Sequence, residues 1–145
     1  MRAVLDTNVL VSAFLFGGPP LDVLDLAEAG VVQVYTSEAA LAELNAVLSR
    51  AKFQGRLRSL GLSAASLVSA CRGLAVTVAP SDPPGVCSDP QDDAFIAIGL
   101  SAGVDMVVSG DRHLLACSGS SPIPVMTVAD FLVAIRDILK ADTDQ

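Results

Sequence analysis

Short apolar runs alternate along this chain with segments of helical periodicity, and this alternation is the feature that most restricts its fold. Runs with the length and apolar character of buried strands lie at 2–6, 31–35, 74–78, 105–109 and 124–127. Strands that are apolar throughout, with helices between them, are typical of a parallel sheet whose two faces are both covered. We therefore predict a three-layer α/β/α fold.

Helical patterns fill the segments between these runs, and several of their ends carry capping residues. Ser37 is a good N-cap, Gly30 ends one helix, and Gly61 interrupts the fourth region, which holds one or two helices. The predicted helices cover 9–15, 21–29, 37–50, 57–72, 90–102, 112–116 and 128–140. No linker or repeat interrupts the chain, so we expect a single domain over 1–145, with a frayed tail from about 141 to 145.

The composition favours a folded protein in a reducing compartment. Hydrophobic residues make up 52% of the chain and charged residues 17%, which excludes intrinsic disorder. No apolar run is long enough to span a membrane, and Arg2 and Asp6 leave no room for the apolar region of a signal peptide. Cys71, Cys87 and Cys117 are scattered and odd in number, so neither a disulfide framework nor a zinc site is expected. We therefore expect a cytoplasmic protein.

The net charge of −7 and the pI near 4.4 limit the ways in which this chain can meet nucleic acid. They exclude a protein that coats nucleic acid by electrostatic attraction alone. They leave open an enzyme that reaches phosphate groups through a bound cation or one local basic patch. They also suit a basic protein partner.

Two acidic residues follow predicted strands, at the edge where parallel α/β sheets form their sites. Asp6 comes at the end of the first strand, and Asp111 follows the fourth strand through Gly110. Ligands bind beyond the carboxyl ends of the strands in open parallel sheets, so both acids are candidate site residues. Each also has a structural alternative, because either could cap the helix that follows it.

Two further acids lie on predicted helices without a basic residue nearby. Glu43 has only alanine and valine three and four positions away, which leaves space for another element to pack close, although a solvated glutamate is the alternative. Asp93 heads the apolar stripe of its helix, where a buried carboxylate needs a partner. Asp89 and Asp92 have a simpler explanation, as an N-cap and a first-turn acid.

The acids Asp6, Glu43, Asp93 and Asp111 come from four separate elements and would repel one another if they met. At about 4 Å and an effective dielectric near 20, each pair costs about 4 kcal/mol. Since no basic residue is well placed to offset this repulsion, Mg²⁺ or Mn²⁺ is the expected neutraliser. Such an ion promotes phosphodiester hydrolysis by polarising a phosphoryl oxygen and lowering the pKa of water. We expect Asn8 to brace Asp6 or its loop, and Ser109 to orient a water or cap a helix.

Four stretches carry a resemblance that extends in order and spacing over nearly the whole chain: VLDTNVLVSAFLFGGPP, TSEAALAELNAVLSRAKF, DPQDDAFIAIGLSAGVDMVVSGDRHLL and IPVMTVADFL. Together they resemble the PIN-domain family, and in particular its VapC-like toxins of toxin–antitoxin pairs. The resemblance implies a five-stranded parallel sheet, metal-dependent endoribonuclease activity, a cognate antitoxin and a homodimer. Carried over by position, it implies that the catalytic, metal-binding acids are Asp6, Glu43, Asp93 and Asp111, with Asn8 and Ser109 in support and Asp89 and Asp92 as further candidates.

Four of the nine basic residues gather after the Glu43 helix, at Arg50, Lys52, Arg56 and Arg58. Taken alone, such a cluster is more often a solvated helix end. Because of its position we predict that it contacts the RNA backbone. Exchanging Arg56 and Arg58 for Glu should then raise KM for RNA without changing metal binding.

Substitution of Asp93 should report the predicted repulsion directly. Asp93→Asn is expected to abolish cleavage and to raise the metal-free melting temperature, because it removes one repelling charge. Added Mn²⁺ should raise the melting temperature of the native chain but not that of this variant.

Other functional classes explain these residues less well. A phosphoacceptor signalling domain of similar topology needs an acid after the third strand and a Lys after the fifth, where this chain has Ala79 and Thr127. A nucleotide-binding module needs a glycine-rich phosphate loop after a strand, and none is present. A catalytically silent PIN-like domain that binds protein or RNA stays open as an alternative.

Overall fold

Five parallel strands form the centre of the molecule in the order β3-β2-β1-β4-β5. The structure is a computed structural model that describes residues 1–143. The strands are β1 (Arg2–Leu5), β2 (Gln33–Thr36), β3 (Val76–Thr77), β4 (Met106–Val108) and β5 (Val125–Met126). The helices are α1 (Thr7–Phe16), α2 (Pro19–Glu28), α3 (Glu38–Leu48), α4 (Ala51–Leu60), α5 (Ala64–Leu74), α6 (Pro90–Ala102), α7 (Arg112–Ala116) and α8 (Val128–Thr143).

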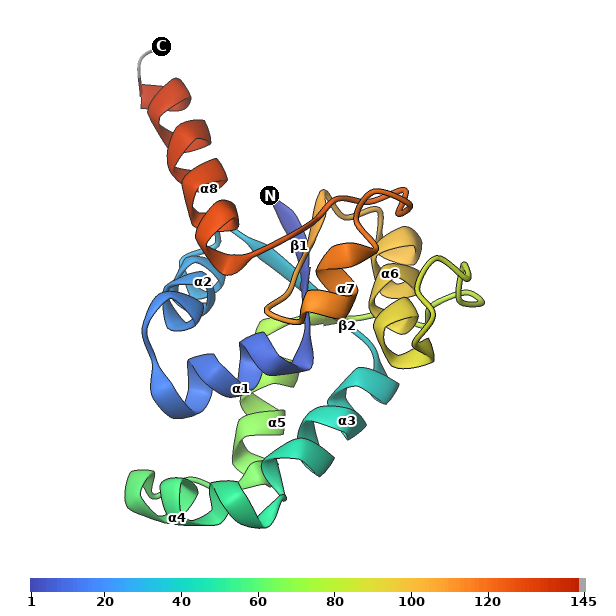
Figure 1. Cartoon of the computed structure of the whole chain (residues 1–145). Helices are drawn as coiled ribbons and strands as arrows, with labels where there is room; N and C mark the ends of the chain where they lie inside the picture. The colour runs from blue at the N-terminus through green and yellow to red at the C-terminus, as the bar shows by residue number, and fades with distance from the viewer. Residues whose placement is uncertain (144–145) are drawn as a thin grey trace.

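The sheet separates two apolar cores, because successive strand residues point to opposite faces. Ala3 and Leu5 of β1 join the core that is formed with α1, α2, α3, α5 and α8. Val4, between them, joins the other core, which is formed with α6 and α7. Figure 1 shows this division, with α6 and α7 on one side of the strands and α1, α2 and α8 on the other.

The register of the sheet places the ends of β1 and β4 side by side. The two strands pair from Ala3 opposite Met106 to Leu5 opposite Val108. The backbone N–H of Asp6 also donates to the carbonyl oxygen of Val108 at 3.0 Å, so the two chains separate only beyond this point. The residues that follow β1 and β4 therefore leave the sheet together, at its carboxyl edge.

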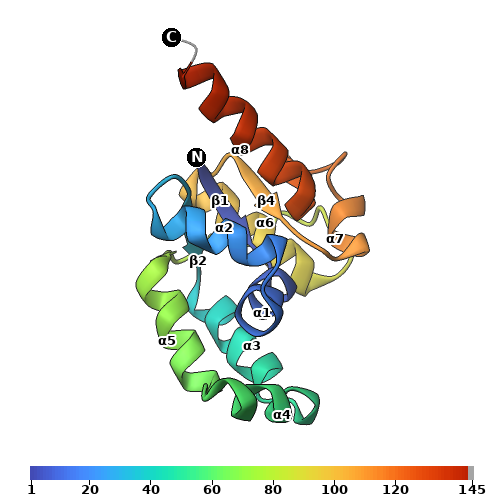
Figure 2. The same cartoon turned by 90° about the vertical axis from the view of Figure 1, so that its left-hand side faces the viewer.

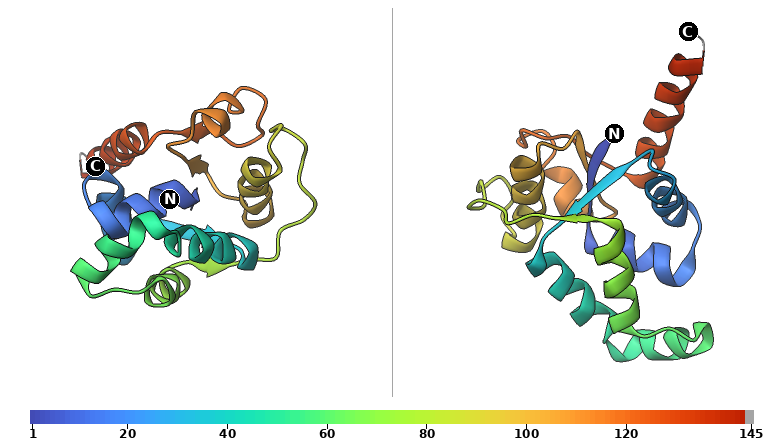
Figure 3. Two further views of the ribbon diagram at one scale, coloured as in Figure 1. Left: turned by 60° about the horizontal axis from the view of Figure 1, so that its bottom comes forward. Right: turned by 180° about the vertical axis from the view of Figure 1, so that it is seen from behind.

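Helices of both layers surround this edge. α3 packs against α1 and α5, whereas α6 packs against β1, β2, β4 and α7. Figure 3 (left) looks toward the edge from below and shows α1, α3, α6 and α7 arranged around the strand ends. The C-terminal half of α8 projects away from the sheet at the other end of the molecule (Figures 1 and 2).

The predicted three-layer fold is confirmed, and the predicted elements agree with the structure to within a few residues at most ends. One difference is that α4 begins at Ala51, so most of the basic segment is helical. Another is that α8 continues to Thr143, through part of the tail that we predicted to be frayed. Residues 144–145 of that tail lie outside the described residues.

Within the described chain, no single helix is long and apolar enough to cross a membrane. Taken together, α1 and α2 have the length and apolar composition of a membrane-spanning segment, but the two helices are bent by 96° relative to each other.

Candidate active site

Asp6 lies where β1 ends and α1 begins, and its carboxylate is held by two groups. Oδ1 accepts a hydrogen bond from the backbone N–H of Val9 at 2.9 Å, so Asp6 is the N-cap of α1. Oδ2 accepts a short hydrogen bond from the hydroxyl of Ser109, which directly follows β4. Both side chains are buried. The helix cap thus uses one carboxylate oxygen, and the other binds the end of the neighbouring strand.

Ser109 links Asp6 to Asp111 across the carboxyl edge. Its hydroxyl oxygen accepts a hydrogen bond from the backbone N–H of Asp111 at 2.9 Å, while its proton is donated to Asp6. Asp111 in turn caps α7, because its Oδ1 accepts from the backbone N–H of His113 at 2.8 Å. The two acids that follow strands are therefore neighbours.

Glu43 reaches the same edge from α3. Its Oε2 accepts a hydrogen bond from the hydroxyl of Thr7 at 3.0 Å. Thr7 is the first residue of α1 and directly follows Asp6. Because α1 packs against α3, this contact fixes the Glu43 carboxylate beside the end of β1.

Asp93 of α6 is turned toward the preceding loop. Its carboxylate accepts three backbone hydrogen bonds, from Gly85 and Val86 at 2.8 Å and from Cys87 at 3.0 Å. The residue is only 2% exposed. Burial acts to raise its pKa, but the three N–H donors outweigh burial and hold the pKa below the usual value for Asp. Asp93 therefore anchors the loop to α6.

Asp92, one residue earlier, faces the other acids. Burial raises its pKa above the usual value, and the negative charges of Asp111, Asp89 and Glu43 raise it further, while the nearby His113 acts in the opposite direction. The structure thus places Asp92, and not Asp93, beside Asp6, Glu43 and Asp111, which corrects the position that we predicted for Asp93.

These acids surround one pocket of about 220 Å³ at the carboxyl edge, which we call the acid pocket. Its lining residues are Asp6, Thr7, Asn8, Glu43, Val47, Arg50, Asp89, Gln91, Asp92, Phe95 and Asp111. Five carboxylates from four parts of the chain therefore face one space. Two of these carboxylates, Asp6 and Asp92, have raised pKa values. Burial and the charge of Asp111 raise the pKa of Asp6, although hydrogen bonds from Ser109 and Val9 act to lower it. A pocket of this kind favours a cation.

The donor set of the acid pocket suits a hard divalent ion. Its polar side chains offer carboxylate, hydroxyl and amide oxygens, and no thiol or imidazole is among its lining residues. As the side chains stand in residues 1–143, no three carboxylate, imidazole or thiol groups are close enough together to ligate one ion. Mg²⁺ still fits, because it usually keeps several water ligands and is bound through one or two carboxylates.

The basic residues predicted to contact RNA divide into two groups. Arg50, the N-cap residue of α4, lines the acid pocket. Arg56 is engaged elsewhere, because its Nε donates to the carbonyl oxygen of Leu15 at 2.7 Å and its guanidinium packs over an aromatic ring of α1. Lys52 and Arg58 are exposed on α4.

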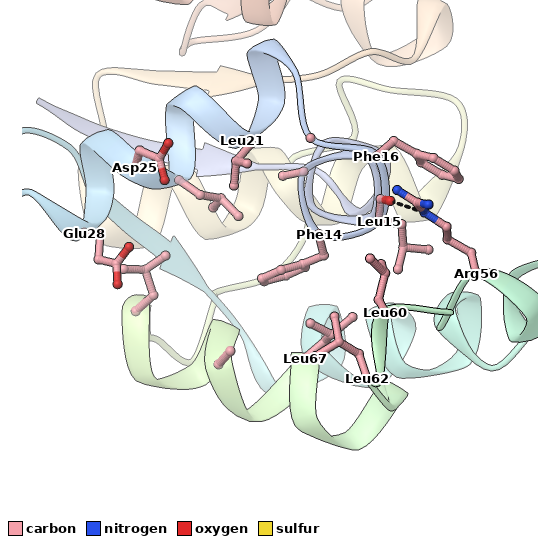
Figure 4. A pocket seen from close by; sticks show the side chains of 15 residues that line it. Phe14, Leu15, Phe16, Leu21, Asp25, Glu28, Arg56, Leu60, Leu62 and Leu67 are labelled. Carbon is pink, nitrogen blue, oxygen red and sulfur yellow. Dashed lines mark hydrogen bonds between the residues drawn. The ribbon is translucent and has the colours of Figure 1, made fainter. Parts of the chain in front are cut away.

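A larger cavity, of about 460 Å³, lies between α1, α2, α4 and α5. Figure 4 shows Phe14 and Leu67 pointing into it, with Asp25 and Glu28 on one wall and Arg56 on the other. Its walls are mostly apolar, and its only two carboxylates both come from α2. The smaller acid pocket is therefore the better candidate for chemistry on a phosphate group.

The family of the chain follows from a comparison with known proteins. The PIN domain family matches residues 2–113, which include every acid of the pocket. The chain therefore belongs to the PIN domain family, as its sequence motifs predicted.

Solved structures with a similar fold include two that cover most of this chain. The first is PAE2754 from Pyrobaculum aerophilum, with a TM-score of 0.63 and 14% identity over 94% of this chain and 96% of that chain. The second is VapBC2 from Rickettsia felis bound to a DNA fragment from their promoter, with a TM-score of 0.57 and 15% identity over 88% of this chain and 98% of that chain. No curated protein matches the sequence.

Four residues that line the pocket were not predicted as site residues: Thr7, Val47, Gln91 and Phe95. Val47 lies four residues after Glu43, on the same face of α3. Thr7 directly follows Asp6, but its contact with Glu43 spans 36 residues of sequence and left no local signal. Gln91 and Phe95 lie one residue before and three residues after Asp92. Once Asp92 is placed at the pocket, the helical spacing of three brings Phe95 to the same face.

Proposed function

We propose that this chain is a Mg²⁺- or Mn²⁺-dependent endoribonuclease that cleaves RNA phosphodiester bonds and acts as the toxin of a toxin–antitoxin pair. PIN domains are generally nucleases, and membership of the family supports phosphodiester hydrolysis. The observation that carries the proposal is the acid pocket, where five carboxylates face one space and two of them have raised pKa values.

Asp6, Glu43, Asp92 and Asp111 are the proposed metal-binding and catalytic acids, with Asp89 at the edge of the pocket. When bound, a divalent ion neutralises phosphate charge and supplies a water of lowered pKa. The chain's own residues hold the acids in place, since Ser109 binds Asp6 and Thr7 binds Glu43. Asn8 lines the same pocket, and its amide is proposed to support these carboxylates.

Arg50 is the proposed phosphate contact of the acid pocket. Among the lining residues it alone is basic, and a guanidinium donates hydrogen bonds in a geometry that matches phosphate oxygens. Lys52 and Arg58 are exposed further along α4 and are proposed to contact the RNA backbone outside the pocket. Arg56 is less suited to this role, because its Nε already donates to Leu15.

A cognate antitoxin is the proposed protein partner. The similarity to VapBC2, a toxin–antitoxin complex, supports such a partner, and so does the apolar cavity of Figure 4, beside which Phe16 is 61% exposed.

We further propose a homodimer, because Val133, Ile138 and Leu139 expose apolar surface on α8. Light scattering on the purified chain tests the dimer. A cytoplasmic location agrees with three free cysteines, and cell fractionation tests it.

Cleavage of mixed RNA by the purified chain tests the central proposal. Fragments should appear with Mn²⁺, disappear with excess chelator, and be absent from the Asp6→Asn and Asp92→Asn variants. Asp137→Asn, on the exposed surface of α8, is the matched control and should cleave normally. A chain that binds Mn²⁺ and RNA without cutting would support the alternative of a catalytically silent PIN-like domain.

A further inference from the structure

A second cavity opens directly beside the acid pocket, between the N-terminal halves of α3 and α6. We call this cavity, of about 300 Å³, the α3–α6 slot. Ala39 and Ala40 form its wall on α3, and Ala94 and Ile98 form much of its wall on α6. Its surface is mostly apolar, in contrast to the carboxylates of the neighbouring pocket.

The slot exists because the two helices pack on different parts of the molecule. α3 is held by α1 and α5, whereas α6 is held by the sheet and α7. Alanine side chains on both facing surfaces leave the space between the helices unfilled. Ala39 is exposed and Ala40 and Ala94 are half-buried, so the slot is accessible from solvent.

The slot and the acid pocket share three lining residues, Glu43, Gln91 and Phe95. A chain segment that places a phosphate among the carboxylates therefore has an apolar cavity immediately next to it. Nucleotides have this order of chemical groups: a charged phosphate, then a ribose, then a base with apolar faces and a polar edge. The exposed Gln91 amide, at the junction, offers both a donor and an acceptor to such an edge.

We propose that the α3–α6 slot holds the base of a nucleotide next to the cleaved phosphodiester, with Gln91 binding the edge of that base. The inference rests on the proposed nuclease function, because the acid pocket sets the position of the phosphate. A base can enter only when it is unstacked, so the slot selects single-stranded RNA. It also gives the enzyme a means to prefer one base over another at a fixed distance from the cut.

Filling the slot tests the inference. Ala39→Phe places a ring in the cavity, and Ala42→Phe is its matched control, since Ala42 is also exposed on α3 but does not line the slot. The substrates are a short single-stranded RNA that the native chain cleaves and versions that lack one base near the cut. Removing the base that occupies the slot should lower kcat/KM roughly tenfold for the native chain and for Ala42→Phe.

Ala39→Phe should cleave the intact RNA roughly tenfold more slowly and should be insensitive to removal of that base. Its melting temperature and its response to Mn²⁺ should match those of Ala42→Phe, which excludes a folding or metal defect. Gln91→Leu should change which base is preferred. Equal cleavage by Ala39→Phe and Ala42→Phe, with the same sensitivity to base removal, would overturn the inference.

Failure of the proposed function would be visible separately, as a native chain that cleaves no RNA in Mn²⁺. RNA binding then tests the slot on its own. Fluorescence anisotropy measures the affinity for the intact RNA and for the RNA that lacks the base. Weaker binding of the intact RNA to Ala39→Phe than to Ala42→Phe would support a base site without cleavage. Equal binding by both variants would overturn the inference.

Discussion

Asp93→Asn should destabilise the protein, which reverses the expectation that we drew from the sequence. The Asp93 carboxylate accepts hydrogen bonds from three successive backbone N–H groups of the loop before α6. Asparagine keeps one oxygen, which serves Val86 and Cys87, but it turns an amide N–H₂ group toward the N–H of Gly85. One charged hydrogen bond is therefore lost outright, and the other two lose their charge.

The size of the effect follows from these contacts. A hydrogen bond to a charged group contributes about 1.5–3 kcal/mol, so Asp93→Asn should lower the free energy of unfolding by about 2–3 kcal/mol. At about 4 °C per kcal/mol for a domain of this size, the melting temperature should fall by about 10 °C. Asp93→Ala removes all three acceptor contacts and should lower it further. Thermal unfolding followed by circular dichroism, with chelator present, measures both variants.

The neighbouring Asp92→Asn variant is the control, and its expected effect has the opposite sign. It removes a charge that repels Asp111 and Asp89, so the metal-free melting temperature should rise by a few degrees, about 1 kcal/mol. Added Mn²⁺ should stabilise the native chain and Asp93→Asn, but should stabilise Asp92→Asn much less. The placement of the two acids would be refuted if Asp93→Asn raised the melting temperature and Asp92→Asn lowered it.

The pH dependence of the Asp93 contribution has a definite sign. Its pKa in the folded protein lies below the ordinary value of 3.8, so the unfolded chain takes up a proton first as the pH falls. The stabilisation is therefore fully present well above pH 3.8, begins to decrease as the unfolded chain takes up its proton near pH 3.8, and is lost as the pH falls through the folded pKa. The difference in stability between the native chain and Asp93→Asn should be constant from pH 7 to about 5 and should narrow below it.

Four further predictions concern residues that hold the acids or belong to the basic cluster. Ser109→Ala removes a bond that lowers the pKa of Asp6, so the acidic limb of the pH–rate profile should move to higher pH, while Ser109→Thr should leave it in place. Thr7→Val should weaken Mn²⁺ binding roughly tenfold by calorimetry, since it frees the Glu43 carboxylate, and Thr7→Ser should not. Arg56→Glu should lower the melting temperature by about 4 °C through loss of its bond to Leu15, whereas Arg50→Ala should raise KM for RNA several-fold at unchanged stability.

The sequence predicted the strand-end acids because their position depends on few assumptions. Any residue that follows a parallel strand leaves the sheet at the same edge, so Asp6 and the Ser109–Asp111 turn had to be neighbours once β1 and β4 paired. Position on a helix is harder to infer, because successive residues differ by about 100° around the axis. In α6 the apolar pattern does not show which side of the helix faces the pocket, because five successive residues from Phe95 to Gly99 are all buried. The apolar pattern of α6 therefore does not decide between Asp92 and Asp93, although we predicted Asp93.

Asp93 also shows why a buried carboxylate does not by itself mark an active site. Its carboxylate does have a partner, as we predicted, but that partner is not a cation. Its partner is instead the backbone of a glycine- and proline-rich loop. The sequence does not show that the N–H groups of this loop point toward the Asp93 side chain. Three such donors satisfy one acid and lower its pKa, whereas its neighbour Asp92 lies among like charges and has a raised pKa. Of two adjacent acids, the one that lacks backbone donors is the one whose ionised form needs a cation, and in this chain that residue faces the acid pocket.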